Sequence, residues 1–388
     1  MKTVLSVDVA KNKSMIMLMN NDGEILIDTK EIKHNLEEFE KVKAEIKEIN
    51  PQNLTVFMES TGTYHLPVER YFKENGFNTL VINSLTTKNN YDTIRKTKTD
   101  KVDARTIASM IMSDVNLKSY SNTSYHNEEL KSLTRYRFDK VKERAKLKSS
   151  ISRLVCILFP ELEKLVPTLH MASVYALLSE FPSANAIASS HLTRLTNLLS
   201  ENSHGRYGKD TANLIRNAAR NSIGSHMPAK SLELKHTIKL IKELTTEINE
   251  IETEIKSIMD KINSPILTIP GIGYNTGAMI IAEIGDFNRF DSADKILAYA
   301  GMSPSTYQSG QLENCHSHME KRGSRYLRYA LYNATKYVCF WDESFGVYLG
   351  KKRSEGKHYN VALSHATKKL VRLIFAMEKS KQPYQPTV

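Results

Sequence analysis

The first third of the chain alternates short apolar runs with stretches that have helical spacing. Apolar runs at residues 2–9, 14–19, 24–32, 54–58 and 79–82 predict five strands, and the Asp-Gly pair at 22–23 predicts a hairpin turn. Residues 36–49, 66–74 and 100–113 repeat apolar positions every three or four residues, as amphipathic helices do. The order of three strands, helix, strand, helix, strand and helix predicts a mixed sheet with helices on its faces.

The middle of the chain is predicted to be helical and to contain a heptad repeat. Residues 130–159 form a strongly basic helical stretch. Farther on, apolar residues recur in steps of three and four with Lys and Glu on the flanks, which is the pattern of a coiled-coil seam. The seam positions are Leu234, Ile238, Ile241, Leu244, Ile248, Ile251, Ile255, Ile258 and Ile262. Two interpretations stay open: self-association of two chains, or an intrachain hairpin with the basic helix.

A third region begins near Pro265. Residues 266–286 predict a helix, a tight turn containing Gly271 and Gly273, and a second helix, an arrangement similar to a helix-hairpin-helix motif. A single core stops growing at roughly 250–300 residues, so a chain of 388 residues predicts several domains. We expect an α/β domain at residues 1–118, a helical and coiled-coil region at 119–264, and a mostly helical C-terminal domain at 265–388.

Composition narrows the class of protein. The formal net charge of +11 and the pI of about 9.2 favour an anionic polymer such as nucleic acid as partner. Three cysteines are too few for a disulfide framework. No apolar stretch reaches the roughly 18 residues that span a membrane, and the N-terminus does not have the pattern of a signal peptide. We therefore expect a cytoplasmic protein with no membrane partner.

Four acidic residues are predicted to lie where α/β sheets bind their ligands. Asp8 interrupts the apolar first strand, Glu59 directly follows the run at 54–58, and Asp100 and Asp103 share one face of a predicted helix. If that helix packs beside the first strand, the carboxylates converge and need a cation to offset their repulsion. Oxygen ligands alone suit Mg²⁺ or Mn²⁺. Each acid also has a structural interpretation, as a solvated strand end, a turn residue or a helix cap.

The motifs around these acids resemble those of the DEDD transposases, the insertion sequence 110 family. They are SVDVAK around Asp8, ESTGTY around Glu59, and KTDKVDARTIA around Asp100 and Asp103. Farther along, LTIPGIG, AEIGD, AYAGMSP, QSG and KRGSRYLR resemble the family's C-terminal transposase domain. The resemblance implies a ribonuclease-H-like first domain, similar to the Holliday-junction resolvase RuvC, with the four acids as catalytic residues and metal ligands.

The resemblance also implies a catalytic serine, which by position is Ser309 of the QSG segment. The chain departs from the family's Ser-Ser-Gly-Gly form, since it has Gln308 and Gln311, and Ser303 and Ser305 are alternatives. Serine needs a base or a metal to become a nucleophile. The hypothesis is that Ser309 attacks a DNA phosphodiester at the metal site, forms a transient phosphoester and so allows strand exchange. Without the resemblance, a plain Ser-Gly turn is the simpler interpretation.

Basic residues and the glycine turn are candidates for nucleic-acid contacts. Exposed amides of a turn can hold phosphate, and cations beside an aromatic residue can follow a phosphate backbone. The candidates are Lys98, Lys101, Arg105, Arg135, Arg137, Gly271, Gly273, Lys321, Arg322, Arg325 and Arg328. The resemblance implies donor and target DNA and a structured bridge RNA as partners, the RNA choosing sites by base pairing. We expect a dimer or a dimer of dimers, associated with the nucleoid.

Two other functions would use the same features. A RuvC-like, metal-dependent junction nuclease needs the four acids but no serine step. A non-catalytic nucleic-acid-binding protein needs only the basic surfaces. Cys315, His316 and His318 also suggest zinc, but structural zinc takes four ligands and no further pair is near in sequence.

Overall fold

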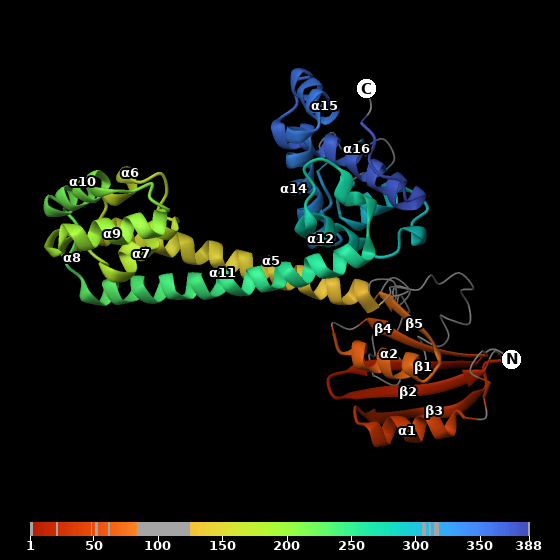
Figure 1. The fold of residues 1–388 in the computed structure, drawn as a ribbon. Coiled ribbons are helices and arrows are strands. Elements are labelled where there is room, and N and C mark those ends of the chain that lie inside the picture. The colour runs from red at the N-terminus through yellow and green to blue at the C-terminus, as the bar shows by residue number, and fades with distance from the viewer. Residues whose placement is uncertain are drawn as a thin grey trace. The chain divides into compact units, whose positions relative to one another are not determined.

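The computed structural model describes residues 3–20, 22–47, 49–50, 53–60, 63–83, 125–304, 308–309, 312–313 and 318–386. The chain forms two compact units, Met1–Thr123 and Ser124–Val388, which Figure 1 shows as ribbons. The division into three domains at residues 118 and 264 stays a prediction. None of the described helices combines the length and the apolar content that crossing a membrane requires.

The first unit contains the predicted mixed sheet. Its strands are β1 (Thr3–Ala10), β2 (Lys13–Asn20), β3 (Ile25–Lys33), β4 (Leu54–Ser60) and β5 (Asn78–Asn83), in the order β3-β2-β1-β4-β5. β1 pairs antiparallel with β2 and β2 with β3, whereas β1 pairs parallel with β4 and β4 with β5. The turn between β2 and β3 forms because Asn20 Oδ1 accepts from the backbone amides of Asp22 and Glu24, and Gly23 takes a φ of 82°.

Two helices cover one face of this sheet. Phe39 of α1 (Leu36–Glu45) and Phe72 of α2 (His65–Glu74) lie 5.8 Å apart between ring centroids. Both belong to one core with Val7 of β1 and Met58 of β4. Because side chains alternate along a strand, the residue that follows Val7 and the residue that follows Met58 point to the opposite face. Phe57 also points there and is fully buried.

The second unit is helical. Its helices are α5 (Tyr125–Leu158), α6 (Leu162–Leu165), α7 (Ala172–Glu180), α8 (Ala184–Ser189), α9 (Leu192–Ser203), α10 (Lys209–Arg220), α11 (Pro228–Ile262), α12 (Tyr274–Ile284), α13 (Ala293–Tyr299), α14 (Arg325–Trp341), α15 (Glu343–Ser354) and α16 (Tyr359–Ser380). Two 3-10 turns, Pro265–Thr268 and Phe287–Arg289, and the short strands β6 (Gln308–Ser309) and β7 (Leu312–Glu313) complete it. The expectation of a mixed-sheet first region followed by a helical remainder is confirmed.

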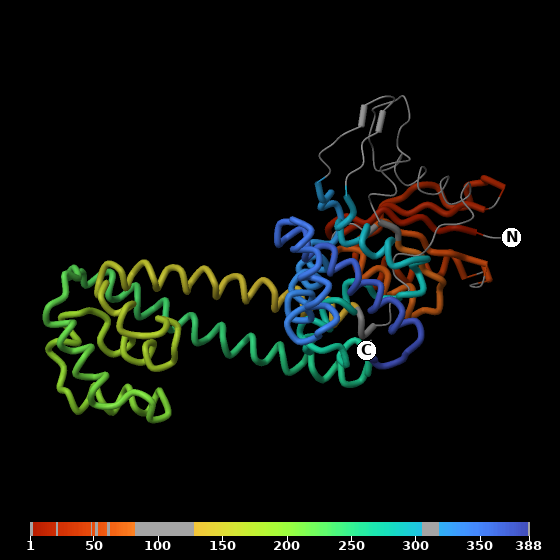
Figure 2. Tube along the Cα trace, turned by 90° about the horizontal axis from the view of Figure 1, so that it is seen from above, coloured from red at the N-terminus to blue at the C-terminus, as the bar shows by residue number. Residues whose placement is uncertain are grey.

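The long helices α5 and α11 lie side by side (Figures 1 and 2). Seven of the nine seam residues are buried within the chain, namely Leu234, Ile238, Ile241, Ile248, Ile251, Ile255 and Ile258. At one end the seam joins a core with α7 and α9, and at the other a core with α12 and α14. Lys140 of α5 also pairs with Glu247 of α11 at 2.6 Å. The seam therefore forms the intrachain hairpin, while self-association stays a prediction.

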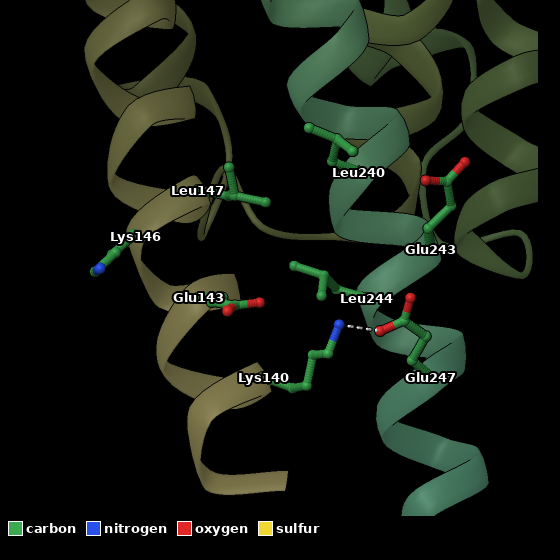
Figure 3. A pocket seen from close by; sticks show the side chains of 8 residues that line it. All are labelled: Lys140, Glu143, Lys146, Leu147, Leu240, Glu243, Leu244 and Glu247. Carbon is green, nitrogen blue, oxygen red and sulfur yellow. Dashed lines mark ion pairs between the residues drawn. The ribbon is translucent and has the colours of Figure 1, made fainter. Parts of the chain in front are cut away.

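The hairpin opens near its middle. Figure 3 shows Leu147 of α5 facing Leu240 and Leu244 of α11 across a groove of about 410 Å³, with the Lys140–Glu247 ion pair at its edge. Leu240 is 49% exposed, and Leu244 is the seam residue that this gap leaves only half-buried. The heptad pattern alone does not reveal this opening, because its apolar steps continue without a break.

A buried carboxylate connects three helices of the second unit. The side chain of Glu283 in α12 is fully buried and accepts hydrogen bonds from Arg135 of α5 at 2.6 and 3.0 Å. Ser324, which caps α14, donates to the same carboxylate at 2.6 Å. The side chain of Arg135 is 38% exposed, and its guanidinium carbon lies 4.7 Å from the ring centroid of Tyr326. Arg135 can therefore reach water whereas Glu283 cannot, so we expect substitutions of the two residues to lower the free energy of unfolding by different amounts.

We predict that Arg135→Met destabilises the chain more than Glu283→Gln. Loss of the arginine leaves a fully buried carboxylate without its cation, which costs about 3–5 kcal/mol of unfolding free energy. Loss of the carboxylate charge leaves an arginine that can reach water, which costs about 1–3 kcal/mol. Arg153→Met, at a residue whose side chain is 70% exposed, is the control, with an expected change under about 1 kcal/mol. Urea unfolding of the full chain measures all three, and the reverse order of the first two would contradict the account.

Candidate active site and nucleic-acid interface

Two of the four predicted acids lie on adjacent central strands. The last paired residues of β1 and β4 are Val7 and Met58, and Asp8 and Glu59 follow them directly. Adjacent strands are about 4.8 Å apart, so these two residues are near neighbours on one face of the sheet. Both are half-buried. The sheet therefore brings Asp8 and Glu59 together near the carboxyl ends of parallel strands, where α/β sheets place their ligands.

The chemistry of this pair fits a hard divalent cation. Two close carboxylates repel each other unless positive charge neutralises them, and oxygen donors suit Mg²⁺ or Mn²⁺. Asp100 and Asp103 lie outside the described residues, as do Lys98, Lys101 and Arg105. Within the described part of the chain, no group of three or more His, Cys, Asp or Glu side chains is placed to hold a metal. Asp8 and Glu59 are thus the described half of the predicted ligand set.

The candidate serine belongs to a small hairpin in the second unit. Ser309 of β6 pairs with Leu312 of β7, and Gln308 pairs with Glu313. Just before it in the chain, the backbone carbonyl of Ser303 accepts from the amide of Glu320 at 3.1 Å, which closes the base of this segment. The alternative Ser305, together with Cys315 and His316 of the zinc interpretation, lies outside the described residues. The paired backbone places Ser309 in the last pair of the short ladder, next to residues 310 and 311.

Some residues of the basic motif at 321–328 pack inside the protein, and others are exposed to solvent. Gly323 has a φ of 128°, and a Cβ there would lie 2.2 Å from the carbonyl oxygen of Tyr299, so only glycine fits. Arg328 donates to the carbonyl of Ala300 at 2.8 Å and so holds this loop. The candidates Lys321, Arg322 and Arg325 are exposed. The exposed cations of this motif, rather than Arg328, are available to a phosphate backbone.

The candidate arginines of α5 have partners within the protein. Arg135 binds the buried Glu283, as described above. Arg137 pairs with Glu252 of α11, with its Nε 2.7 Å and its Nη2 2.6 Å from the same carboxylate oxygen. The basic pattern of α5 thus serves in part to pair this helix with α11. Sequence reasoning missed this role because the partner of Arg137 lies 115 residues farther along the chain.

The two glycines of the turn before α12 have different roles. Gly271 has a φ of 90°, and a Cβ there would lie 2.6 Å from the backbone carbon of Tyr337 in α14. Gly273 is the N-cap of α12, has open space around it, and no side chain caps the helix. Gly271 therefore lets the turn pack against α14, whereas Gly273 leaves the first-turn amides of α12 accessible to an anion.

We predict that Gly271→Ala destabilises the chain far more than Gly273→Ala. The first substitution forces both a strained φ and a clash with the α14 backbone, which costs at least about 2 kcal/mol. The second adds a methyl group in open space at a favourable φ of −93°, and we expect a change within about 1 kcal/mol. Thermal and urea unfolding of the two variants measure the difference. Equal stability of the two variants would contradict the packing role of Gly271.

Two models of known protein families match parts of this chain. Residues 5–160 match a model described as a transposase, of the DEDD type of IS110, and residues 263–349 match a model described as "Transposase IS116/IS110/IS902 family". The first match spans all four acids, and the second spans Ser309 and the glycine turn.

Similar proteins come from several bacterial insertion elements. The chain is 24% identical to an uncharacterized 43.6 kDa protein of insertion element IS110 from Streptomyces coelicolor, over 74% of this chain and 72% of that protein. It is 26% identical to an uncharacterized 42 kDa protein of IS900 from Mycobacterium paratuberculosis, over 74% and 73%. It is also 26% identical to a pilin gene-inverting protein of Moraxella lacunata, over 50% and 60%. The chain belongs to the IS116/IS110/IS902 family of insertion-sequence transposases.

Proposed function

We propose that this protein is a DNA recombinase that moves its insertion sequence by cutting and rejoining DNA strands. The observation that carries the proposal is the placement of Asp8 and Glu59 on neighbouring strands, inside a family match that also includes Asp100 and Asp103. The relatives named as pilin gene-inverting proteins support strand exchange over simple nicking, because inversion of a gene requires every cut strand to be rejoined.

The proposed reaction is a pair of phosphoryl transfers through Ser309. The serine hydroxyl loses its proton, its oxygen forms a bond to phosphorus, and a bond between phosphorus and a deoxyribose oxygen breaks. The departing deoxyribose oxygen takes up a proton. In the second transfer a hydroxyl of another DNA strand loses its proton, and its oxygen forms a bond to the phosphorus of the serine phosphoester. The bond between phosphorus and the serine oxygen breaks, and that oxygen takes up a proton. The number of phosphodiester bonds is conserved, so rejoining needs no external energy source.

The four acids are proposed to hold Mg²⁺ or Mn²⁺ beside the reacting phosphate. A bound divalent cation would supply positive charge that offsets the negative charge developing on the phosphate oxygens. Asp8 and Glu59 would hold it from the sheet face opposite to α1 and α2. The half-buried position of both carboxylates suits this role, because their charge is less screened there than on an open surface.

Donor and target DNA are the proposed substrates, with a structured bridge RNA as guide. Lys321, Arg322 and Arg325 are exposed cations in a loop and helix start of the second unit. Exposed lysines and arginines bind the phosphate backbone of nucleic acid without distinguishing its base sequence. Base pairing with an RNA would then choose the sites. The proposed place of action is the nucleoid of a prokaryotic cell.

We predict that Asp8→Asn, Glu59→Gln and Ser309→Ala each lower strand exchange at least a hundredfold. The first two remove ligand charge from the metal site, and the third removes the nucleophile. The measurement is excision and joining of the complete insertion element, with its flanking non-coding DNA, on a plasmid in cells. Ser303→Ala is the matched control and should exchange strands normally. Full activity of Ser309→Ala with loss in Asp8→Asn would favour the junction nuclease, and full activity of all variants would contradict the proposal.

The proposal includes self-association of the chain. In the groove of Figure 3, the seam residue Leu244 and its neighbour Leu240 are not covered by α5, and Lys140, Lys146 and Glu243 flank them. A second helix with the same pattern of leucines and mixed charges would cover these leucines and pair with the charges. A second copy of this chain carries that pattern, and so a dimer or a dimer of dimers is proposed.

We predict that Leu240→Glu weakens self-association about ten- to hundredfold, because a buried leucine contributes about 1.5–3 kcal/mol. Sedimentation equilibrium of the full chain measures the dissociation constant. Leu232→Glu is the matched control, since this leucine of α11 is 55% exposed and does not line the groove. Unchanged association of Leu240→Glu, or an equal effect in both variants, would contradict a contact at this groove.

A further inference from the structure

A cavity of about 410 Å³ lies where the first turn of α12 meets α14. Its wall includes Tyr329, Asn333 and Tyr337 of α14, Asn275 and Thr276 of α12, and Arg137 of α5. The volume is within the range of small-molecule sites, about 300–1,000 Å³. The wall combines aromatic rings, amides and a guanidinium group, which are the groups that contact nucleotides in proteins. We call this cavity the α12–α14 pocket.

The aromatic part of the pocket is a row along α14. Tyr329, Asn333 and Tyr337 follow each other at intervals of four residues, so they share one face of the helix. Tyr329 is 47% exposed and Tyr337 is 57% exposed. The ring of Phe138 packs edge-on against Tyr329 with centroids 4.8 Å apart, which fixes that ring. The exposed ring of Tyr337 offers a face on which a planar base can stack.

The position of this row relative to α12 is fixed by the backbone. Gly271, just before α12, lies against the backbone of Tyr337, where even one added methyl group would clash. This contact holds the first turn of α12 beside the tyrosine row. The pocket is therefore built from two helices in direct contact, and its walls are in place before a ligand enters.

The polar part of the pocket has unused hydrogen-bonding capacity. α12 starts without a side-chain cap, and the residues of its first turn line the pocket, so its first-turn amides have no capping side chain there. Asn275 has a buried Oδ1 with no hydrogen-bond partner within the described residues. Glu252 engages Nε and Nη2 of Arg137, which leaves Nη1 as a donor. This oxygen is shielded from the open pocket, so the polar groups offered to a ligand are the first-turn amides of α12 and Nη1 of Arg137.

We propose that the α12–α14 pocket holds one unpaired nucleotide of the bound nucleic acid. The base stacks on Tyr337, its edge meets the amides of Asn275 and Asn333, and its phosphate lies at the start of α12 beside Arg137. This inference rests on the proposed function in taking nucleic acid as the partner. It adds a site that recognises an extruded nucleotide, separate from the acids and from Ser309. A single-stranded or bulged position in DNA or RNA supplies such a nucleotide, whereas a fully paired duplex does not.

The test uses the full chain in EDTA, so that binding is measured without cleavage. The probe is a DNA duplex with one bulged 2-aminopurine, compared with the same duplex carrying an abasic bulge and with a fully paired duplex. We expect the bulged base to bind about 5- to 150-fold more tightly than the abasic bulge, the size of one base–aromatic stack. Stacking should also quench the 2-aminopurine fluorescence. Comparing the affinity for the same bulge in an RNA hairpin shows whether the pocket prefers a nucleotide from DNA or from RNA.

Variants of one tyrosine connect this binding to the pocket. Tyr337→Ala should lower the affinity for the bulged base to that for the abasic bulge and abolish the quench, while Tyr337→Phe should keep both. Tyr359→Ala is the matched control, since this tyrosine is 41% exposed on α16 and does not line the pocket. Unfolding curves of Tyr337→Ala check that this variant is folded, which we expect because the replaced side chain is exposed.

The outcomes separate this inference from the proposed function. Wild-type protein that shows no preference for the bulged base, or Tyr337→Ala that binds as the wild type does, overturns the pocket even if strand exchange occurs in cells. A preference that Tyr337→Ala abolishes supports the pocket even if the element does not exchange strands. A change in sedimentation mass of Tyr337→Ala, with base binding intact, would assign the tyrosines to a protein contact and overturn the proposal.

Discussion

The fully buried carboxylate of Glu283 is the interaction on which the second unit depends. It receives two hydrogen bonds from Arg135 and one from Ser324, so one side chain joins α5, α12 and α14. Burying a charge is unfavourable unless it is paired and hydrogen-bonded, and here both conditions are met. Ser324 caps α14, and the exposed cations lie at the start of this helix and in the loop just before it. Helices α12 and α14 also form most of the wall of the α12–α14 pocket. Surfaces proposed to bind nucleic acid are thus held in place by a side chain that is itself fully buried.

In the first unit the corresponding constraint is the alternation of side chains along the strands. Val7 and Met58 bind the sheet to α1 and α2 through an apolar core. The same alternation obliges Asp8 and Glu59 to project from the opposite face, next to each other. Two acids at adjacent positions would normally destabilise a sheet through their repulsion. In the proposed function, a bound divalent cation would offset this repulsion.

The sequence predicted those features that depend on local pattern. The five strands and their mixed arrangement follow from the apolar runs and the order of the elements, whereas the pairing of β1 with β4, which makes Asp8 and Glu59 neighbours, is seen only in the fold. The two interpretations of the α11 seam could not be separated, since a heptad fits an intrachain and an interchain partner equally well. The opening at Leu240 was not predicted either, because it depends on how α5 diverges from α11.

Long-range partners account for the remaining differences. The charge of Arg135 was visible in the sequence, but its pairing with Glu283 joins residues 148 apart, which no local pattern reveals. Gly271 and Gly273 look alike in the sequence, yet only Gly271 has a neighbour that excludes a side chain. The sequence named these basic residues and glycines as candidate nucleic-acid contacts, while their division into packing and surface roles required the fold.

The central claim is that Ser309 forms the covalent link to DNA during strand exchange. The most direct measurement is to incubate the full chain with Mg²⁺ and DNA that carries the element's junction, denature it, digest it with protease and nuclease, and locate the nucleotide-bearing peptide by mass spectrometry. The account predicts a phosphonucleotide on Ser309, absent from Asp8→Asn. Cleaved DNA without any protein adduct, or an adduct on another residue such as Ser303, would contradict it.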